Sequence, residues 1–273
     1  MKITQAPFYS FFSIPFYREV IMMPLRKGFL YLLYLAGIAT AVFAVYVSLI
    51  LVPRVNNFIG WMQQEMPPLF WNGESLTMST QEAYTMFHPE LGLVAVIDTN
   101  QKDITLAQMG DAPVFVTSEK VYIKREGGGL NLYPLADFFN QGPDTRMEVQ
   151  FDGNFIDQFY RSWKPWAIFS ALVFYLPFFF IWKIVAALFY SLFGLLVNQF
   201  RKNKLPYSAV LNVTIFALTP MILIQLLGFF IPVLNLIFLG FFGAFVVMWI
   251  YLFLGIKLTE SASEVEPPPE SGL

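Results

Sequence analysis

Five residues interrupt the long apolar stretches of this chain, and they are its candidates for chemistry within a membrane. Lys183 is the one ionisable side chain deep inside such a stretch, whereas Asn212, Thr219, Pro220 and Gln225 share another stretch. An ionisable residue in hydrocarbon is costly and often belongs to an ion or proton path. The apolar stretches contain no Asp or Glu that would complete a relay. We therefore expect Lys183 to snorkel to the headgroups and the other polar side chains to bond between helices, with a kink at Pro220.

No other residues have the spacing of a catalytic, cofactor or metal site. His88 is the single histidine, and together with Glu82 and Glu90 it lacks the ligand spacing of zinc or non-haem iron. It is predicted to be a surface or turn residue before Pro89. The glycines at 127–129 follow an expected strand without the helix that a phosphate-binding loop requires. The chain has no cysteine, which excludes disulfides and thiolate chemistry. We predict no enzyme, no cofactor and no metal.

The composition is that of a polytopic membrane protein. Of 273 residues, 56% are hydrophobic and only 13% are charged, whereas about a quarter of a soluble domain is charged. A helix of roughly 20 apolar residues crosses a ~30 Å hydrocarbon core. Four stretches are long enough to do so: 28–52, 165–200, 207–231 and 233–256.

Charge asymmetry orients the predicted helices. The segment 53–164 holds 14 acidic and 8 basic residues, and the rest of the chain holds 5 acidic and 9 basic residues. Cationic residues flank the spans on the side expected to be cytoplasmic: Arg18, Arg26, Lys27, Arg201, Lys202, Lys204 and Lys257. Both termini are therefore predicted in the cytoplasm of a bacterial inner membrane, with the lipid bilayer as a partner. No basic cluster is interleaved with aromatics, so a nucleic-acid partner is not expected.

The predicted fold is a membrane bundle of four transmembrane helices with a small extracytoplasmic α+β domain inserted between helices 1 and 2. The stretch 165–200 is longer than one crossing requires, so one long helix from Pro165 and two membrane segments stay as alternatives, of which we favour the first. The predicted parts are an aromatic cytoplasmic or interfacial segment (1–27), helix 1 (28–52), the α+β domain (53–164), a three-helix membrane region (165–256, comprising 165–200, 207–231 and 233–256) and a disordered acidic cytoplasmic tail (257–273).

Local patterns within 53–164 predict several elements. Strands are expected at 93–97, 114–116 and 121–123, with a turn at 98–101. The glycines at 127–129 should join the last of these strands to another at 130–133. Helices are expected at 135–139 and at 151–160, the second leading into the next span.

The order of these parts resembles a family of bacterial membrane proteins of unknown function, one type of which is labelled YvdJ-like, a maltodextrin-utilisation protein. The resemblance rests on short motifs in sequence order: Phe8-Tyr9-Ser10-Phe11-Phe12-Ser13-Ile14-Pro15-Phe16-Tyr17, Pro67-Pro68-Leu69-Phe70-Trp71-Asn72-Gly73-Glu74-Ser75-Leu76, Val96-Ile97-Asp98-Thr99, Tyr207-Ser208 and Leu218-Thr219-Pro220. The C-terminal spans also resemble the Yip1 superfamily more faintly. The resemblance implies a fold and a membrane location, and it supplies no catalytic residue.

The expected function is that of a non-enzymatic accessory, scaffold or assembly factor, with a membrane-protein partner or a homo-oligomer. Two alternatives stay open. The first is a transport component, for example of oligosaccharide uptake, in which the span with Asn212 and Gln225 lines a path. The second is a sensor whose extracytoplasmic domain binds a ligand.

Overall fold

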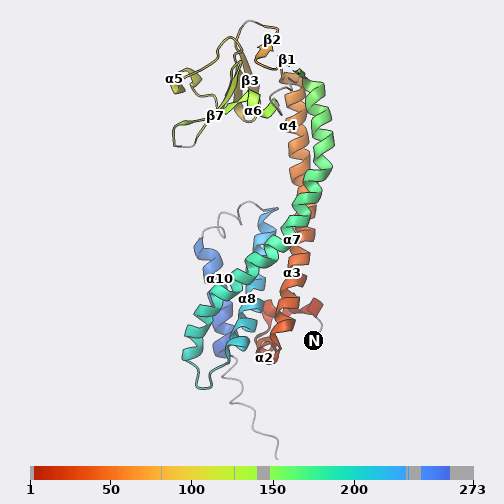
Figure 1. Cartoon of the computed structure of the whole chain (residues 1–273). Coiled ribbons are helices and arrows are strands. Elements are labelled where there is room, and N and C mark those ends of the chain that lie inside the picture. Colours follow the sequence, from red (N-terminus) through yellow and green to blue (C-terminus); the bar gives the residue numbers. More distant parts are fainter. Residues whose placement is uncertain are drawn as a thin grey trace, which may run out of the picture. The chain divides into compact units, whose positions relative to one another are not determined.

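The computed structural model describes residues 3–80, 82–125, 127–139, 148–231, 233 and 241–258. The chain forms two compact units, a helical unit of Met1–Leu51 with Ile168–Leu273 and an α+β unit of Val52–Ala167 (Figure 1). The α+β domain was predicted at 53–164. Its assignment to the extracytoplasmic side stays a prediction. Most of the tail expected to be disordered lies outside the described residues.

The helical unit is built around α8 (Tyr207–Gly228). This helix is uniformly apolar apart from a few hydroxyl and amide side chains, so it can be covered on every side. It contacts helices from both ends of the chain. They are α1 (Ala6–Phe12), α2 (Ile14–Met22), α3 (Leu25–Tyr46), α7 (Gly153–Gln199) and α10 (Phe241–Phe253).

Among the described residues, three helical segments are long and apolar enough to cross a membrane: Leu25–Glu65, Gly153–Gln199 and Tyr207–Gly228. The fourth predicted span, 233–256, is not among them. Residues 234–240 lie outside the described residues. The described part consists of α10 and the π-helical turn η3 (Leu254–Leu258), which form a shorter apolar helix.

Two predicted helix boundaries are wrong. The first apolar helix does not end at 52, because a π-helical turn, η2 (Val47–Leu51), leads directly into α4 (Val52–Glu65). Pro53, which has no backbone N–H to donate within a helix, is the second residue of α4, just after this π-helical turn. The second long helix starts at Gly153 rather than at Pro165. The Asp152 carboxylate accepts a hydrogen bond of 2.8 Å from the Phe155 backbone N–H and caps this start. From there α7 is one continuous helix of 47 residues, so the alternative of two membrane segments is wrong.

The N-terminal aromatic segment packs into the helical unit. Phe16, Tyr17 and Val20 of α2 are buried. The Phe16 ring meets Phe216 of α8 edge-on at 5.4 Å, and the Tyr17 hydroxyl donates to the Ser10 carbonyl at 3.0 Å. The location predicted for this segment, cytoplasmic or interfacial, stays a prediction, and its α2 part packs against α8.

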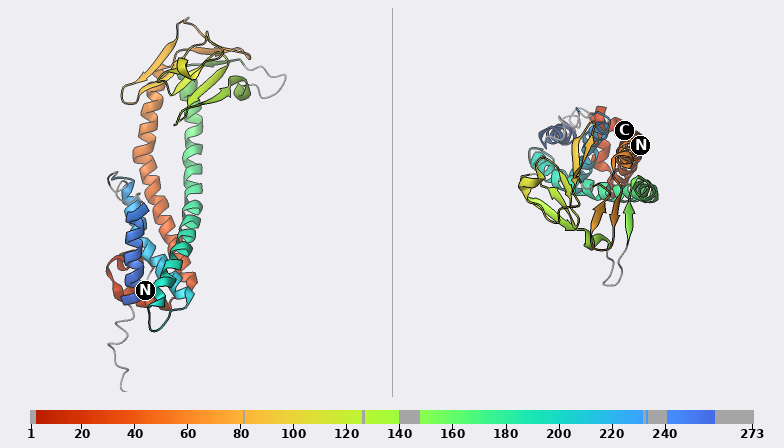
Figure 2. Two further views of the ribbon diagram at one scale, coloured as in Figure 1. Left: turned by 90° about the vertical axis from the view of Figure 1, so that its left-hand side faces the viewer. Right: turned by 90° about the horizontal axis from the view of Figure 1, so that it is seen from above.

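The described residues of the α+β unit form two sheets, whose strands are drawn in two further views in Figure 2. The five-stranded sheet has the order β3-β4-β5-β6-β7, and only the β4–β5 pair is parallel. The three-stranded sheet has the order β2-β1-β8 and is antiparallel. The elements are β1 (Leu69–Trp71), β2 (Leu76–Met78), β3 (Tyr84–His88), β4 (Gly92–Ile97), α5 (Leu106–Met109), β5 (Val114–Val116), β6 (Lys120–Lys124), β7 (Leu130–Pro134), α6 (Leu135–Phe139) and β8 (Val149–Phe151).

The local predictions for this unit hold for four strands of the five-stranded sheet, and its strand β3 was not predicted. Strands β4, β5 and β6 lie where apolar runs predicted them, and β6 and β7 form the expected hairpin around Gly127–Gly129. These three glycines have φ of +98°, +88° and +117°, which side chains disfavour. Helix α6 has the predicted bounds. The predicted helix at 151–160 is wrong at its start, because Phe151 ends β8.

Candidate functional site

The polar residues predicted in the third apolar stretch lie on α8, whose residues 209–220 are all buried. Asn212 and Thr219 have no exposed area. The structure therefore places these side chains between helices, where a polar group without a partner would cost free energy.

Lys183 and Gln225, separated by 42 positions, form a pair between α7 and α8. The Lys183 ammonium donates a hydrogen bond of 2.8 Å to Gln225 Oε1. It also lies 5.2 Å from the centre of the Phe179 ring, at a cation–π distance. Lys183 is only 2% exposed, so the expectation that it snorkels is wrong. An amide oxygen and an aromatic face replace water around the ammonium.

Two further contacts fasten α3 to α8. The hydroxyls of Tyr31 and Thr219 share a hydrogen bond of 2.7 Å, and Tyr31 stacks on Phe216 at 4.2 Å. The Asn212 amide donates to the Met23 carbonyl, just before α3, at 2.5 Å. Gly28 of α3 faces Asn212 so closely that a Cβ at position 28 would overlap Asn212 Oδ1.

In these contacts, most of the polar groups that would line a transport path already have a hydrogen-bond partner within the protein. Thr214 also bonds within its own helix, to the Val210 carbonyl at 2.8 Å. Pro220 lies inside α8, and α8 stays helical through it to Gly228. Among the predicted polar residues, the hydrogen bonds between neighbouring segments support a role in helix packing.

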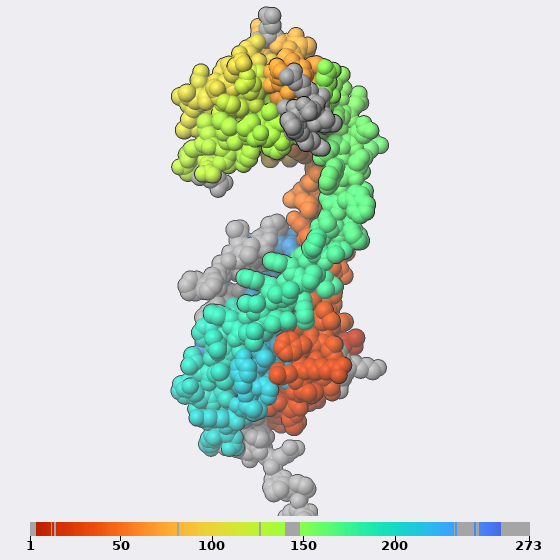
Figure 3. Space-filling view, in the orientation of Figure 1, coloured from red at the N-terminus to blue at the C-terminus, as the bar shows by residue number. Residues whose placement is uncertain are grey.

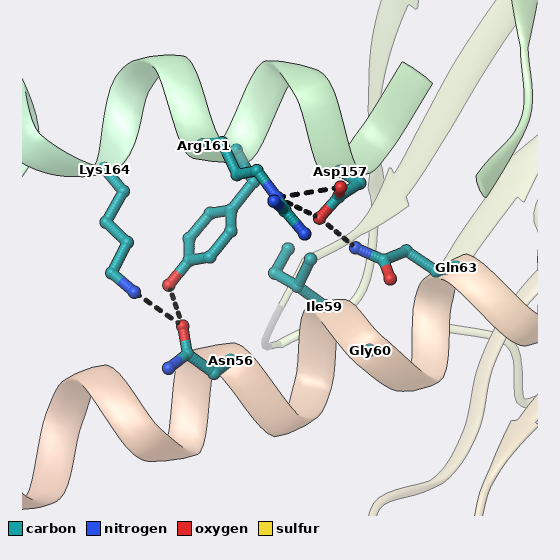
Figure 4. A pocket seen from close by; sticks show the side chains of 8 residues that line it. Asn56, Ile59, Gly60, Gln63, Asp157, Arg161 and Lys164 are labelled. Carbon is teal, nitrogen blue, oxygen red and sulfur yellow. Dashed lines mark hydrogen bonds and ion pairs between the residues drawn. The ribbon is translucent and has the colours of Figure 1, made fainter. Parts of the chain in front are cut away.

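A polar pocket of about 430 Å³ lies within the α+β unit, between α4 and the first turns of α7. Figure 4 shows the side chains of both helices projecting into this space. Asn56 and Gln63 come from α4, and Asp157, Arg161 and Lys164 come from one face of α7. The remaining lining residues are Ile59, Gly60 and Tyr160.

Hydrogen bonds join the two walls of this pocket. Asn56 Oδ1 accepts from the Tyr160 hydroxyl at 2.6 Å and from the Lys164 ammonium at 3.0 Å. The Gln63 amide donates to Asp157 at 3.0 Å, and Arg161 Nε forms an ion pair with the same carboxylate at 2.8 Å. Sequence reasoning missed the pocket because its walls are about a hundred residues apart. The spacing of Asp157, Arg161 and Lys164 over two turns was the available signal.

An apolar cavity of about 250 Å³ lies in the core of the same unit. Residues from both sheets and from α4 and α6 line it, and all of them are apolar. They are Met62, Met66, Leu69, Leu76, Met86, Ala95, Ile97, Val116, Leu135, Phe139 and Phe151.

The remaining sequence candidates have structural roles. His88, predicted as a surface or turn residue, is the last residue of β3. Its Nδ1 accepts hydrogen bonds from the backbone N–H groups of Glu90 and Leu91 in the turn that follows, at 3.1 and 3.2 Å. Its ring also packs edge-on against Trp61 at 4.8 Å. Within the described ranges, no three His, Cys, Asp or Glu side chains form a group that could hold a metal ion.

One polar cluster ties the loop before α5 to β6. Lys120 forms an ion pair with Asp103, and the Tyr122 hydroxyl donates to Asp103 at 2.8 Å. These hydrogen bonds, that of Lys120 first, hold the pKa of Asp103 below its usual value of 3.8. Desolvation, followed by the bond to Asp103, raises the pKa of Tyr122. The cluster is a structural tie on the surface of the unit.

Comparison with known proteins identifies a family and no characterised relative. A family model described as "Protein of unknown function (DUF1189)" matches residues 5–256. No curated protein and no solved structure matches the chain. Because the family model covers both compact units, the chain belongs to the DUF1189 family of proteins of unknown function.

Proposed function

We propose that this protein is a non-enzymatic integral protein of a bacterial cytoplasmic membrane that acts as an accessory, scaffold or assembly factor for a membrane-protein partner. The observation that carries the proposal is the enclosure of α8. Its residues 209–220 are buried, and Asn212, Thr219 and Gln225 bond to neighbouring segments. A helix used in this way holds a bundle together.

The outward face of α7 supports membrane insertion. Phe174, Phe178 and Trp182 are 70%, 69% and 60% exposed in the isolated chain, and this helix forms the green-to-cyan band of the surface in Figure 3. Large exposed apolar surfaces mark contact with lipid or with another protein. In the proposed topology four spans cross the membrane, the α+β unit is extracytoplasmic and both termini are cytoplasmic. The resemblance to YvdJ-like proteins, and the fainter one to the Yip1 superfamily, direct the partner search to membrane complexes, sugar importers among them.

Site-specific photocrosslinking in native membranes tests the accessory role. A photoreactive residue at Phe178, on the outward face of α7, is expected to capture one partner protein in near-stoichiometric yield. The same residue at Leu218, which is fully buried on α8, is the matched control and should capture none. Purification of a partner-free protein, together with solute flux through proteoliposomes that contain it alone, would contradict the proposal and favour transport.

The apolar cavity favours ligand sensing as a second candidate function. A cavity of about 250 Å³ lined by apolar groups suits a small apolar ligand. Substitution of Ala95, a small lining residue, by Leu would fill part of it. Saturable binding of a fluorescent apolar probe by the full chain, lost in Ala95→Leu, would support this function. Absence of probe binding in both proteins would remove it.

A further inference from the structure

We propose that the polar pocket between α4 and the first turns of α7 binds a phosphodiester, the headgroup of an anionic membrane lipid. The inference adds a ligand to the proposed membrane-anchored protein and rests on its insertion in a bilayer. It does not depend on the identity of the protein partner.

The charge of the pocket favours an anion. Two cations, Arg161 and Lys164, line it with one carboxylate, Asp157. The ion pair with Asp157 uses Arg161 Nε, which leaves the two terminal nitrogens of the guanidinium as donors. Planar guanidinium donors suit the oxygens of a phosphate group. The pocket therefore retains one positive charge after the internal ion pair is formed.

Neutral donors stand beside these cations. Asn56 Oδ1 accepts from both Tyr160 and Lys164, so these bonds use the oxygen of the amide and leave its NH₂ group as a donor. Lys164 uses one of its three donors on Asn56 and has two left. The internal bonds thus hold the donors in place before a ligand arrives, which lowers the entropic cost of binding.

The pocket has room for such a group. Its volume of about 430 Å³ lies within the range of small-molecule sites. Gly60 forms part of its floor, and a Cβ built there meets no other atom within 4 Å. A larger side chain at this position would therefore grow into open space without displacing the backbone.

The position of the pocket in the sequence points to a lipid as the source of the phosphate. Lys164 is the last charged residue before α7 becomes continuously apolar up to Lys183. On the same turns of α7, Phe159, Trp163 and Trp166 are 55%, 60% and 68% exposed. Exposed Trp and cationic residues at the end of an apolar helix are typical of the headgroup layer. A phosphodiester of the surrounding lipid is abundant at that depth.

The test measures binding by the purified full chain in a phosphate-free, uncharged detergent. The ligands are dihexanoyl phosphatidylglycerol, kept below its micelle concentration, and inorganic phosphate. Two pocket variants are compared with wild type. Arg161→Gln combined with Lys164→Gln removes the cations, and Gly60→Leu fills the pocket while keeping every charge. Arg54→Gln removes a cation of α4 that does not line the pocket, and Gly37→Leu alters a glycine of α3 that also has open space around it. These two are the matched controls.

We expect the wild type to bind the lipid saturably and both pocket variants to bind it at least tenfold more weakly, a change of about 1.4 kcal/mol. The two control variants should bind the lipid with an affinity within about twofold of that of wild type. Equal binding by all five proteins would overturn the pocket as the site. Inorganic phosphate binding as tightly as the lipid would overturn the lipid as its ligand.

Thermal unfolding without ligand verifies that each variant is folded. Leu is a better helix former than Gly by roughly 0.5–1 kcal/mol, so Gly60→Leu should unfold no earlier than wild type. The lipid-binding measurement uses the purified chain without any partner protein. Its result therefore stays valid even if the crosslinking experiment finds no partner. Conversely, lost lipid binding with retained partner capture would reject the lipid site alone.

Discussion

At the scale of single residues, the helical unit joins polar groups that stand far apart in sequence. Lys183 meets Gln225, Tyr31 meets Thr219, and Asn212 reaches the Met23 carbonyl. In an apolar surrounding such bonds are worth roughly 0.6–2 kcal/mol each. Their larger effect is on specificity, because each bond is satisfied in only one register of the two helices that share it.

The close approach of Gly28 to Asn212 predicts a steep cost for a single methyl group. Gly28→Ala places a Cβ onto Asn212 Oδ1 and should destabilise the protein by about 1–3 kcal/mol through overpacking. Gly37→Ala, on the same helix with no atom within 4 Å of the new Cβ, is the control and should be neutral or slightly stabilising. Thermal unfolding of both variants in detergent checks the difference, and equal midpoints would contradict the packing described.

The pair of Lys183 and Gln225 predicts asymmetric effects of substitution. Gln225→Leu leaves a buried ammonium without its acceptor and should cost about 1–3 kcal/mol. Lys183→Met keeps an unbranched side chain that is one atom shorter, removes the charge and should cost less. The double variant should lose less unfolding free energy than the two single variants lose together. The difference, the coupling energy of the pair, should be roughly 0.6–2 kcal/mol. Additive effects in this cycle would show that the two side chains do not interact.

At the scale of elements, short ties on the surface of the α+β unit hold its loops to its strands. The residues after β4 are fixed to the β5–β6 turn by Gln101, whose carbonyl accepts from the Ser118 backbone and hydroxyl at 2.9 and 3.0 Å. Lys102 pairs with Glu119 at 2.6 Å, and Asp103 pairs with Lys120. Three consecutive residues thus meet three consecutive partners, which fixes the crossover between the parallel strands β4 and β5.

The lowered pKa of Asp103 predicts a loss of stability in acid. A group whose folded pKa lies below its unfolded value of 3.8 stabilises the protein above that value and loses this contribution as the pH falls through the folded pKa. The thermal midpoint of wild type should exceed that of Asp103→Asn at pH 6, and the difference should shrink on acidification from about pH 5 to pH 3. A difference that stays constant over this range would show that the carboxylate carries no folding-linked charge.

Local sequence patterns predicted the elements whose contacts are local. The β6–β7 hairpin turns on three glycines, and α6 follows directly after it. The three-stranded sheet was missed because each of its strands has three residues and β1 pairs with β8 about eighty positions away. For the same reason, the pocket between Asn56 and Lys164 was not predicted. The polar residues Lys183 and Gln225 were identified as candidates, but nothing in the sequence indicates that they bind each other.

At the scale of the whole molecule, the two units differ in the surroundings that suit their surfaces, which are apolar for one unit and aqueous for the other. The helical unit contains Tyr207–Gly228 and the greater part of the other two long apolar segments. It exposes large apolar side chains along α7, so it needs lipid or protein around it. The α+β unit contains its own apolar core, centred on Trp71 and the strands around it. An acidic excess in 53–164 suits exposure to water.

Opposite charge in the two units predicts opposite sides of the membrane for two exposed positions. The chain lacks cysteine, so single cysteines at Leu132, exposed on β7, and at Lys204, between α7 and α8, are unique labels. A membrane-impermeant maleimide should label Leu132→Cys in intact cells and Lys204→Cys only after permeabilisation. Labelling of both positions in intact cells would overturn the proposed topology.

The apolar cavity of the α+β unit has a consequence for oxidative damage. Met62, Met66 and Met86 supply three of its lining side chains, and an extracytoplasmic location would place them outside the reducing cytoplasm. Conversion of a thioether to a sulfoxide turns an adaptable apolar group into a polar one, and Met86 is almost fully buried. Mild peroxide should therefore loosen this unit in proportion to the sulfoxide found at these three positions, and Met86→Leu should resist part of the change. The same thioether groups that pack the apolar core would thus be the sites at which an oxidising environment destabilises the unit.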